Sequence, residues 1–388
     1  MKGKLVRRVK RVAFGRNPAW PWHPGNRVQL LVDGDRYFDA MFAVIEQARR
    51  RVLLEFYQVG SGQVMNRMID VLQKARQRQV EVYFLLDDFG SRDLNLEDRA
   101  RLRAAGVCIA FYNPLQAGKL NRNFARDHRK LLVVDGAIAF VGGSGLADEF
   151  IDTEGRRGWH ELMLQISGPV VGDWERLFVR VWRGCSRQAL SLSAAVVRVD
   201  ANARALMKVS TCEGPQQQEI KINFRRRINA SEQRLWLVTA YFLPSWSIRR
   251  ALRRAAARGV DVRLLLPGPQ SDHRAIFYAS QRYYHRLLQA GVKIFEYRPR
   301  FNHAKVCLSD HWVSLGSCNL DHWNLRWNLE ANQEVIDPEL TQALVQLLEA
   351  DFIQSKQVTL TGWRARSLLQ RLREFCIGYV CAVLLRIF

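Results

Sequence analysis

The chain has 388 residues, 48% of them hydrophobic, which excludes a disordered polymer and is enough for two domains with buried cores. Lys and Arg number 59 against 37 Asp and Glu, a formal net charge of +22. This positive excess favours a polyanionic partner, either nucleic acid or an anionic membrane surface. The seven cysteines form no C-x-x-C pair, which favours a reducing, cytosol-facing compartment.

Residues 1–24 are basic and amphipathic. Their Lys and Arg residues are interleaved with Leu, Val and Phe, so the continuous apolar run of a secretory signal is missing. Trp20 and Trp22 end this stretch, and such rings favour the headgroup level of a bilayer. We therefore expect the segment to lie on a membrane surface rather than to be a cleaved leader.

The pattern of strands and helices in the first half of the chain recurs in the second half. Buried strands are predicted at 51–57 and 80–86 and again at 234–241 and 260–266, each pair joined by a helix. Apolar strands that alternate with helices indicate sheets covered on both faces. The sequence therefore predicts an α/β protein made of two similar α/β/α sandwich domains.

The predicted domains are residues 25–190 and 205–355, flanked by the basic segment 1–24 and by a basic and apolar tail at 360–388. The join falls around Gly184 to Pro215, where Ser, Ala and Gln are enriched. We expect the two domains to be related by a pseudo-two-fold axis, with the active site at their interface.

Each half carries one copy of a short motif. The copies lie 175 positions apart and share the spacing of one His, one Lys and one Asp: His128, Lys130 and Asp135, and His303, Lys305 and Asp310. A single copy fits a basic pair on a surface strand, but two copies in register favour a shared site. Side chains alternate along a strand, so His and Lys point the same way, whereas Asp has the opposite parity and begins a turn. We assign both Asp residues a structural role.

A His beside a Lys suits chemistry on a phosphate ester. The ammonium group can hold a phosphoryl oxygen while the imidazole attacks phosphorus or moves a proton. With two pairs, one His can form a covalent phosphohistidine and the other can act as the general acid and base, while both Lys stabilise charge on the equatorial oxygens. This chemistry requires no metal, and the sequence has no H-E-x-x-H or paired C-x-x-C motif. We expect no metal and no cofactor.

The second motif carries a family resemblance. His303, Lys305 and Asp310, followed by the run Gly316-Ser317-Cys318-Asn319, are similar to the H-x-K-x4-D and G-S-x-N signature of the phospholipase D superfamily. From about Gly25 to Asp351 the chain looks most like bacterial cardiolipin synthases of the shorter B type. The resemblance implies that the six residues of the two motifs form the catalytic site.

The resemblance also implies roles for residues after each motif. Ser317 and Asn319 are implied to hydrogen-bond the substrate phosphate or a Lys. The first half departs from the signature, because Gly143 and Gly145 stand at the corresponding places. We therefore expect the halves to be asymmetric, with backbone N–H groups of the two glycines as the substitute.

A catalytic imidazole needs a partner for its second ring nitrogen. Family members supply an acid downstream of each motif, and Glu161 and Glu330 stand at matching places here. We expect these two residues to orient the histidines, the alternative being an ordinary Glu at a strand edge. Resemblance to characterised relatives favours His128 as the nucleophile and His303 as the general acid and base.

The remaining polar candidates are expected to cap helices, form hydrogen bonds or ion pairs, or lie on the surface. They are the Asp87-Asp88 pair and six further histidines: His23, His160, His273, His285, His311 and His322.

The choice between lipid and nucleic acid rests on the tail and on one helix. The tail contains the uncharged run Phe375 to Leu385, which is too short to span a bilayer but can enter one, the alternative being a buried core helix. The Arg-rich helix at 249–258 is either a solvated face or a membrane contact. Three tyrosines instead fit base stacking in a nuclease: Tyr278, Tyr283 and Tyr284.

We interpret the chain as a peripheral enzyme on the cytoplasmic side of the bacterial inner membrane. It is expected to move a phosphatidyl group from a phospholipid, either phosphatidylglycerol or phosphatidylethanolamine, to phosphatidylglycerol. Its expected partners are these lipids and an anionic phospholipid membrane, without nucleic acid. The alternatives are a phospholipase D-type hydrolase and a metal-independent nuclease of the same superfamily. The sequence indicates no oligomeric state.

Overall fold

The computed structural model describes residues 20–116, 123–190, 203–214, 217–321, 327–368, 370–372 and 377. The elements of the first half are, in chain order, β1 (His23–Val32), α1 (Gly34–Glu46), β2 (Arg51–Phe56), α2 (Gln63–Gln77), β3 (Glu81–Asp87), α3 (Leu96–Ala104), β4 (Cys108–Tyr112), β5 (Lys130–Val134), β6 (Ile138–Gly142), the 3₁₀ turn η1 (Asp148–Phe150), β7 (Leu162–Ser167) and α5 (Val171–Cys185).

The second half begins with β8 and ends with a short helix. Its elements are β8 (Ala205–Glu213), α6 (Glu219–Ala230), β9 (Arg234–Val238), β10 (Phe242–Leu243), α7 (Trp246–Ala257), β11 (Asp261–Pro267), α8 (Arg274–Gln281), α9 (Tyr284–Gln289), β12 (Lys293–Tyr297), β13 (Val306–Ser309), β14 (Trp312–Gly316), β15 (Leu320–Asp321), β16 (Leu329–Ile336), α11 (Pro338–Ile353), β17 (Ser355–Val358) and α12 (Leu360–Arg364).

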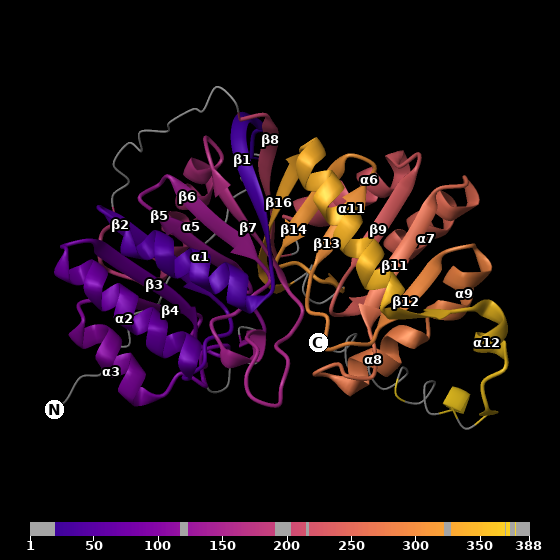
Figure 1. Cartoon of the computed structure of the whole chain (residues 1–388), viewed down its shortest axis with the longest axis horizontal. Helices are drawn as coiled ribbons and strands as arrows, with labels where there is room; N and C mark the ends of the chain where they lie inside the picture. Colours follow the sequence, from indigo (N-terminus) through magenta and orange to yellow (C-terminus); the bar gives the residue numbers. More distant parts are fainter. Residues whose placement is uncertain are drawn as a thin grey trace.

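The strands of the two halves follow the same spatial order (Figure 1). Read outward from the centre, the first half runs β1-β7-β6-β5-β2-β3-β4 and the second runs β8-β16-β14-β13-β9-β11-β12, with β17 added at its edge. The halves are joined where β1 and β8 begin, through the residue pairs His23–Met207 and Asn26–Ala205. The predicted duplication is therefore confirmed in the order of the strands.

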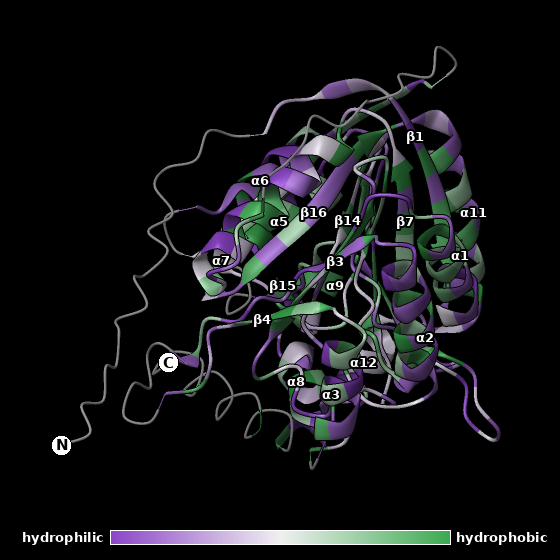
Figure 2. Cartoon of the chain, turned by 90° about the vertical axis from the view of Figure 1, so that its left-hand side faces the viewer, coloured by the Kyte–Doolittle hydropathy of each residue, from purple (hydrophilic) through white to green (hydrophobic). Residues whose placement is uncertain are grey.

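Helices cover both sides of the sheet in each half, as the long apolar strands require. Figure 2 shows α1, α2 and α11 on one side and α5, α6 and α7 on the other. All six residues of β2 and all five of β5 are buried, so the central strands of the first half are closed to solvent on both faces. The predicted α/β/α architecture is confirmed.

A packed interface fixes the two halves against each other. One apolar cluster includes side chains from both halves, among them Phe178 of α5 and Leu344 of α11. Within this contact, Trp174 Nε1 donates a hydrogen bond of 2.8 Å to Gln333 Oε1. Since protein interiors are close-packed, groups that face each other across this interface are held in defined positions.

The two ends of the described chain are folded onto this framework. Trp20 and Trp22 are half-buried against the apolar cores, which differs from the headgroup position expected for both rings. Within the stretch assigned to the tail, Trp363 is buried and its ring lies 5.0 Å from that of Tyr284. Residues 1–19 and most of the run from Phe375 to Leu385 lie outside the described residues. None of the helices that the structure describes is both long and apolar enough to cross a bilayer.

Candidate active site

The two motif histidines line the same pocket, which has a volume of about 680 Å³. His128 immediately precedes Arg129 and β5, and His303 precedes β13 in the other half. The backbone N–H of His128 donates to the carbonyl oxygen of Leu329 (2.9 Å), and that of His303 donates to the carbonyl oxygen of His160 (2.8 Å). Each His is therefore fixed by the backbone of the opposite half.

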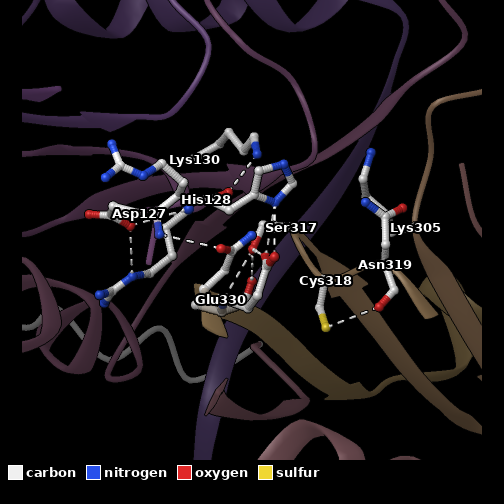
Figure 3. A network of polar contacts seen from close by, with 12 residues as sticks. Asp127, His128, Lys130, Lys305, Ser317, Cys318, Asn319 and Glu330 are labelled. Carbon is white, nitrogen blue, oxygen red and sulfur yellow. Dashed lines mark hydrogen bonds and ion pairs between the residues drawn. The ribbon is translucent and has the colours of Figure 1, made fainter. Parts of the chain in front are cut away.

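Each imidazole is also paired with a Glu from the opposite half. His128 Nδ1 lies 3.0 Å from Glu330 Oε1 and 3.1 Å from Glu330 Oε2 (Figure 3). His303 Nδ1 lies 2.6 Å from Glu161 Oε2. Both carboxylates are fully buried. The pairing crosses the interface, so the acid downstream of one motif contacts the His of the other, an arrangement that the linear spacing does not reveal.

The two motif lysines make different contacts. Lys130 Nζ donates to the carbonyl oxygen of His128 (2.5 Å) and lies 5.2 Å from the centre of the Tyr57 ring. Lys305 Nζ donates to Glu161 Oε2 (3.3 Å) and lies 2.8 Å from His303 Nδ1. Burial lowers the pKa of Lys130 to about 7, and it lowers the pKa of Lys305 as well. The first ammonium group is therefore poised to gain or lose its proton near neutrality.

Burial also lowers the pKa of both imidazoles. For His128 the carboxylate of Glu330 opposes this effect. For His303 the ammonium groups of Lys305 and Lys130 add to it, and the pKa falls well below the usual value. Both rings are therefore neutral in the free protein, because desolvation disfavours the imidazolium form.

The surroundings of the two rings differ. His303 lies among three aromatic rings whose centres are 5.3 to 5.7 Å away: Trp159, Phe150 and Phe301. The ring contact of His128 is Tyr57, with centres 4.8 Å apart. These rings bury His303, and burial disfavours its charged form, an effect to which the neighbouring lysines add.

The two motif aspartates bind backbone N–H groups, and neither lines the pocket. Asp135 accepts from Arg49, Arg50 and Arg51, and Asp310 accepts from Glu232, Gln233 and Arg234. Both adopt a left-handed backbone, with φ of 56° and 51° respectively. They tie the turn after the motif strand to the beginning of β2 or β9, an arrangement that matches a structural role.

Ser317 and Asn319 lie behind the pocket rather than in its wall. The Ser317 hydroxyl donates to Glu330 Oε2 and accepts from the backbone N–H of Ala331 (3.1 Å) (Figure 3). Asn319 Oδ1 accepts from the Thr239 hydroxyl (3.3 Å). In the free protein Ser317 therefore acts on the site through Glu330, whose carboxylate it holds beside His128.

Gly143 is required by the position of Glu161. A Cβ atom at residue 143 would collide with the Glu161 carboxylate, so a serine matching Ser317 does not fit there. A Cβ at Gly145 would similarly meet the carbonyl oxygen of Gln58. The halves are asymmetric as expected, and Gly143 makes room for the Glu161 carboxylate. The role of the glycine N–H groups in binding the substrate stays a prediction.

A buried ion pair positions the segment before His128. Asp87, at the end of β3, lies 3.4 Å from Arg126 and accepts from the backbone N–H of Asp127 (2.9 Å). Arg126 lines the pocket, so its guanidinium adds to the positive charge around the histidines. The expected ion pair of Asp87 thus supports the site directly, a role that only the tertiary structure reveals.

The pocket has a mixed lining. Its exposed apolar side chains include Phe89 (38% exposed) and Leu115 (49% exposed). On the second-half side, the Tyr241 hydroxyl donates to Asp272 Oδ2 (2.6 Å). Within the part of the chain that the structure describes, no three His, Cys, Asp or Glu side chains are grouped to hold a metal.

Comparison with known proteins defines the family. A family model described as "Cardiolipin synthase, PLD-like domain" matches residues 41–182 and 224–352. Cardiolipin synthase A of Pseudomonas aeruginosa is 35% identical over 359 residues, which cover 91% of this chain and 72% of the relative. Cardiolipin synthase A of Pseudomonas fluorescens is 33% identical over 359 residues, 91% of this chain and 74% of the relative.

Solved structures share the fold. Phosphatidylserine synthase of Haemophilus influenzae superposes with a TM-score of 0.70 at 13% identity, covering 93% of each chain. Polyphosphate kinase of Porphyromonas gingivalis superposes with a TM-score of 0.59 at 16% identity, covering 86% of this chain and 49% of the kinase. The fold and the paired motifs are those of the phospholipase D class. Within that class, this chain belongs to the cardiolipin synthase family with a phospholipase D-like domain. The predicted family is confirmed, and the likeness to the B type stays a prediction.

Proposed function

We propose that this protein is a phosphatidyltransferase that forms cardiolipin from a phospholipid donor and phosphatidylglycerol. One observation carries the proposal: two histidines, each held by a Glu of the opposite half, line one pocket together with Lys130. The membership of the cardiolipin synthase family supports the same reaction class.

In the first step, Nε2 of the neutral His128 attacks the phosphorus of the donor. The bond from phosphorus to the headgroup oxygen breaks, and that oxygen takes a proton from His303. The Glu330 carboxylate stabilises the positive charge that develops on the His128 ring. Lys130 and Lys305 offset the negative charge on the equatorial oxygens. Because both imidazoles are neutral in the free protein, the anionic donor must raise the pKa of His303 as it binds.

In the second step, His303 accepts the proton of the phosphatidylglycerol hydroxyl. The resulting alkoxide attacks the phosphorus, the P–N bond to His128 breaks, and cardiolipin leaves. A water molecule in place of the alcohol would give phosphatidic acid, which is the phospholipase D reaction. The exposed apolar side chains of the pocket, Phe89 and Leu115, favour a lipid acceptor by disfavouring water.

The contacts of the two Nδ1 atoms support this division of roles. The polar contacts of His128 Nδ1 within the described chain are with carboxylate oxygens of Glu330, so this nitrogen carries the proton and Nε2 keeps a free lone pair. His303 Nδ1 lies between a carboxylate acceptor and an ammonium donor, Glu161 and Lys305. Either tautomer is accommodated there, which suits a residue that gives a proton and takes one back.

The substrate class also implies where the protein works. We infer a peripheral position on the cytoplasmic side of the bacterial inner membrane, with an anionic phospholipid membrane and two phospholipids as partners and no nucleic acid. Membership of the cardiolipin synthase family supports a phospholipid rather than nucleic acid as the substrate.

The test uses purified protein with vesicles that contain labelled phosphatidylglycerol, with and without phosphatidylethanolamine, in the presence of EDTA. Parallel reactions contain single- and double-stranded DNA. We expect labelled cardiolipin from the wild type and none from His128→Ala or His303→Ala. Cleaved DNA with untouched lipid would overturn the proposal, and phosphatidic acid without cardiolipin would assign the protein as a hydrolase.

A further inference from the structure

A second pocket lies on the outer surface of the second half, away from the active site. This pocket, of about 570 Å³, lies between α7 and α9 and is lined by four arginines: Arg250, Arg253, Arg254 and Arg286. Its other lining residues are Ala257, Gln289 and Ala290, so the lining includes no acidic side chain. We call this surface the arginine groove.

Within the described residues, no carboxylate forms an ion pair with the four guanidinium groups of the arginine groove. Burial lowers the pKa of Arg249, and the neighbouring guanidinium groups of Arg282, Arg286 and Arg253 lower it further. Like charges gathered this closely repel one another, and they are stabilised when an anion binds.

The matching surface of the first half is different. There α2 and α3 carry basic residues beside acids: Arg67 lies 3.0 Å from Asp39, and Arg101 lies 2.8 Å from Asp98. The duplicated fold therefore offers the same helical surface twice, once with paired charges and once with unpaired ones. This contrast argues that the charge of the arginine groove has a function of its own.

Exposed apolar side chains occur at the beginning of α7 and beyond α12. Trp246, 60% exposed at the beginning of α7, stacks against the guanidinium of Arg250 at 5.0 Å. Beyond α12, which packs against α9 through Trp363 and Tyr284, Leu368 and Leu372 are also exposed. Basic residues bordered by Trp and Leu are typical of surfaces that lie at the interface of an anionic bilayer.

The arginine groove is also connected to the active-site pocket through the chain. Leu243 lines that pocket, and α7 begins three residues later at Trp246. Trp246 is therefore at the end of α7 that follows the pocket-lining strand β10 in the chain.

We propose that the arginine groove is the surface by which the protein docks onto anionic phospholipid headgroups, with Trp246 inserted at the headgroup level. This inference rests on the proposed function, because the headgroups that the arginine groove would recognise are those of the proposed substrates. Each basic residue near such a bilayer strengthens binding, and the effect is screened by salt.

The test is vesicle co-sedimentation with the full chain, using phosphatidylcholine vesicles with and without phosphatidylglycerol. The groove variant replaces Arg250, Arg253, Arg254 and Arg286 by Gln. A matched control removes four exposed positive charges from the first half by changing Arg36, Arg67, Lys74 and Arg103 to Gln. A charge-conserving variant carries Lys at the four groove positions. The same proteins are assayed on a short-chain phosphatidylglycerol below its micellar concentration, and on a labelled DNA oligonucleotide by anisotropy.

We expect the groove variant to lose at least tenfold in partitioning onto phosphatidylglycerol vesicles, while the control changes less than threefold and the Lys variant retains binding. Turnover of the short-chain lipid should stay within about twofold in all variants, because the active site is intact. Equal losses in the groove variant and the control would overturn the proposal, as would groove-dependent binding of DNA with unchanged vesicle binding. A wild type that binds vesicles through the arginine groove but transfers no phosphatidyl group would refute the proposed function and leave the docking surface standing.

Discussion

The first and second halves hold the same His and Lys in different surroundings. Around the second motif, three aromatic rings enclose His303, and Lys305 contacts the carboxylate of Glu161 as well as the carbonyl oxygen of His303. Around the first motif, the ring contact of His128 is Tyr57, and Lys130 donates to the carbonyl oxygen of His128. Duplication thus accounts for the two imidazoles on one pocket, and the surroundings of the two imidazoles have diverged. We propose that this divergence underlies different roles of the two histidines.

The largest expected effect comes from removing either imidazole. We predict that His128→Ala and His303→Ala each lower the rate of cardiolipin formation by about 1,000-fold or more, because each step requires both a nucleophile and a proton carrier. The measurement is the initial rate with labelled phosphatidylglycerol vesicles. If one variant kept more than a tenth of the wild-type rate, the two halves would not share one reaction.

The crossed Glu–His pairs give the next effect. We predict that Glu330→Gln and Glu161→Gln each slow the reaction by about 100-fold, since an amide supports the charged imidazole far less than a carboxylate does. Single-turnover kinetics separate the steps. Glu330→Gln should slow mainly the formation of the covalent intermediate on His128, and Glu161→Gln should slow mainly the transfer from this intermediate to the acceptor. If Glu161→Gln instead slowed mainly formation and Glu330→Gln mainly transfer, each Glu would act on the His of its own half.

His160 is expected to stabilise the fold in a way that has no counterpart in the second half. The corresponding residue there is Leu329, whose carbonyl oxygen accepts from His128 as that of His160 accepts from His303. The imidazole lies 2.8 Å from Asp33 and 3.2 Å from Asp351, and although burial opposes it, these two carboxylates raise its pKa to about 9. Because the pKa of His160 is higher in the folded protein, the protonated ring contributes its full stabilisation below the unfolded-state pKa of about 6.5. This contribution is lost as pH rises through about 9.

We therefore predict that His160→Gln lowers the free energy of unfolding by about 2 kcal/mol more at pH 6 than at pH 9.5. Urea unfolding of both proteins at the two pH values measures this difference. Leu329→Met is a suitable control at the matching place, and its effect should not depend on pH. A pH-independent loss in His160→Gln would mean that the imidazole is neutral in the folded protein.

Substitutions at Gly143 and at the corresponding Ser317 test whether the two halves need different residues at this position. Gly143→Ser should displace the Glu161 carboxylate and reduce the rate by about tenfold or more, whereas Ser317→Ala, which removes one hydrogen bond to Glu330, should cost about five- to tenfold. Steady-state rates and thermal unfolding of the two variants provide the measurement. A Gly143→Ser variant as active as the wild type would show that the two halves tolerate the same residue at this place.

The smallest effect concerns the binding of an anion to the free protein. Since the pKa of Lys130 is about 7, its ammonium group loses its proton as pH rises through that value, and affinity for sulfate should fall by several-fold between about pH 6 and about pH 8. Sulfate is useful because its own charge is constant over this range. Calorimetric titration of the wild type and of Lys130→Met gives the comparison, and the variant should bind weakly at both values. An increase in affinity with pH would contradict the assignment.

Much of the fold could be predicted from the sequence, for physical reasons. Continuous apolar runs identify buried strands, and the recurrence of the motif identifies the duplication, since both are local properties of the chain. The crossed pairing of Glu161 and Glu330 could not be read in this way, because it depends on how the two halves face each other. The function of Gly143 also escaped prediction, because a glycine that makes room for a distant carboxylate has no local signature.

The central claim is that one pocket combines a nucleophilic His128 with a proton-carrying His303. Its most direct test is alkaline quenching of the protein during turnover of a labelled donor, followed by mass spectrometry of the peptides. We predict a phosphatidyl adduct on His128 in the wild type, a larger amount of it in Glu161→Gln, and none in His128→Ala. An adduct on His303, or continued transfer with no adduct on either histidine, would contradict the account.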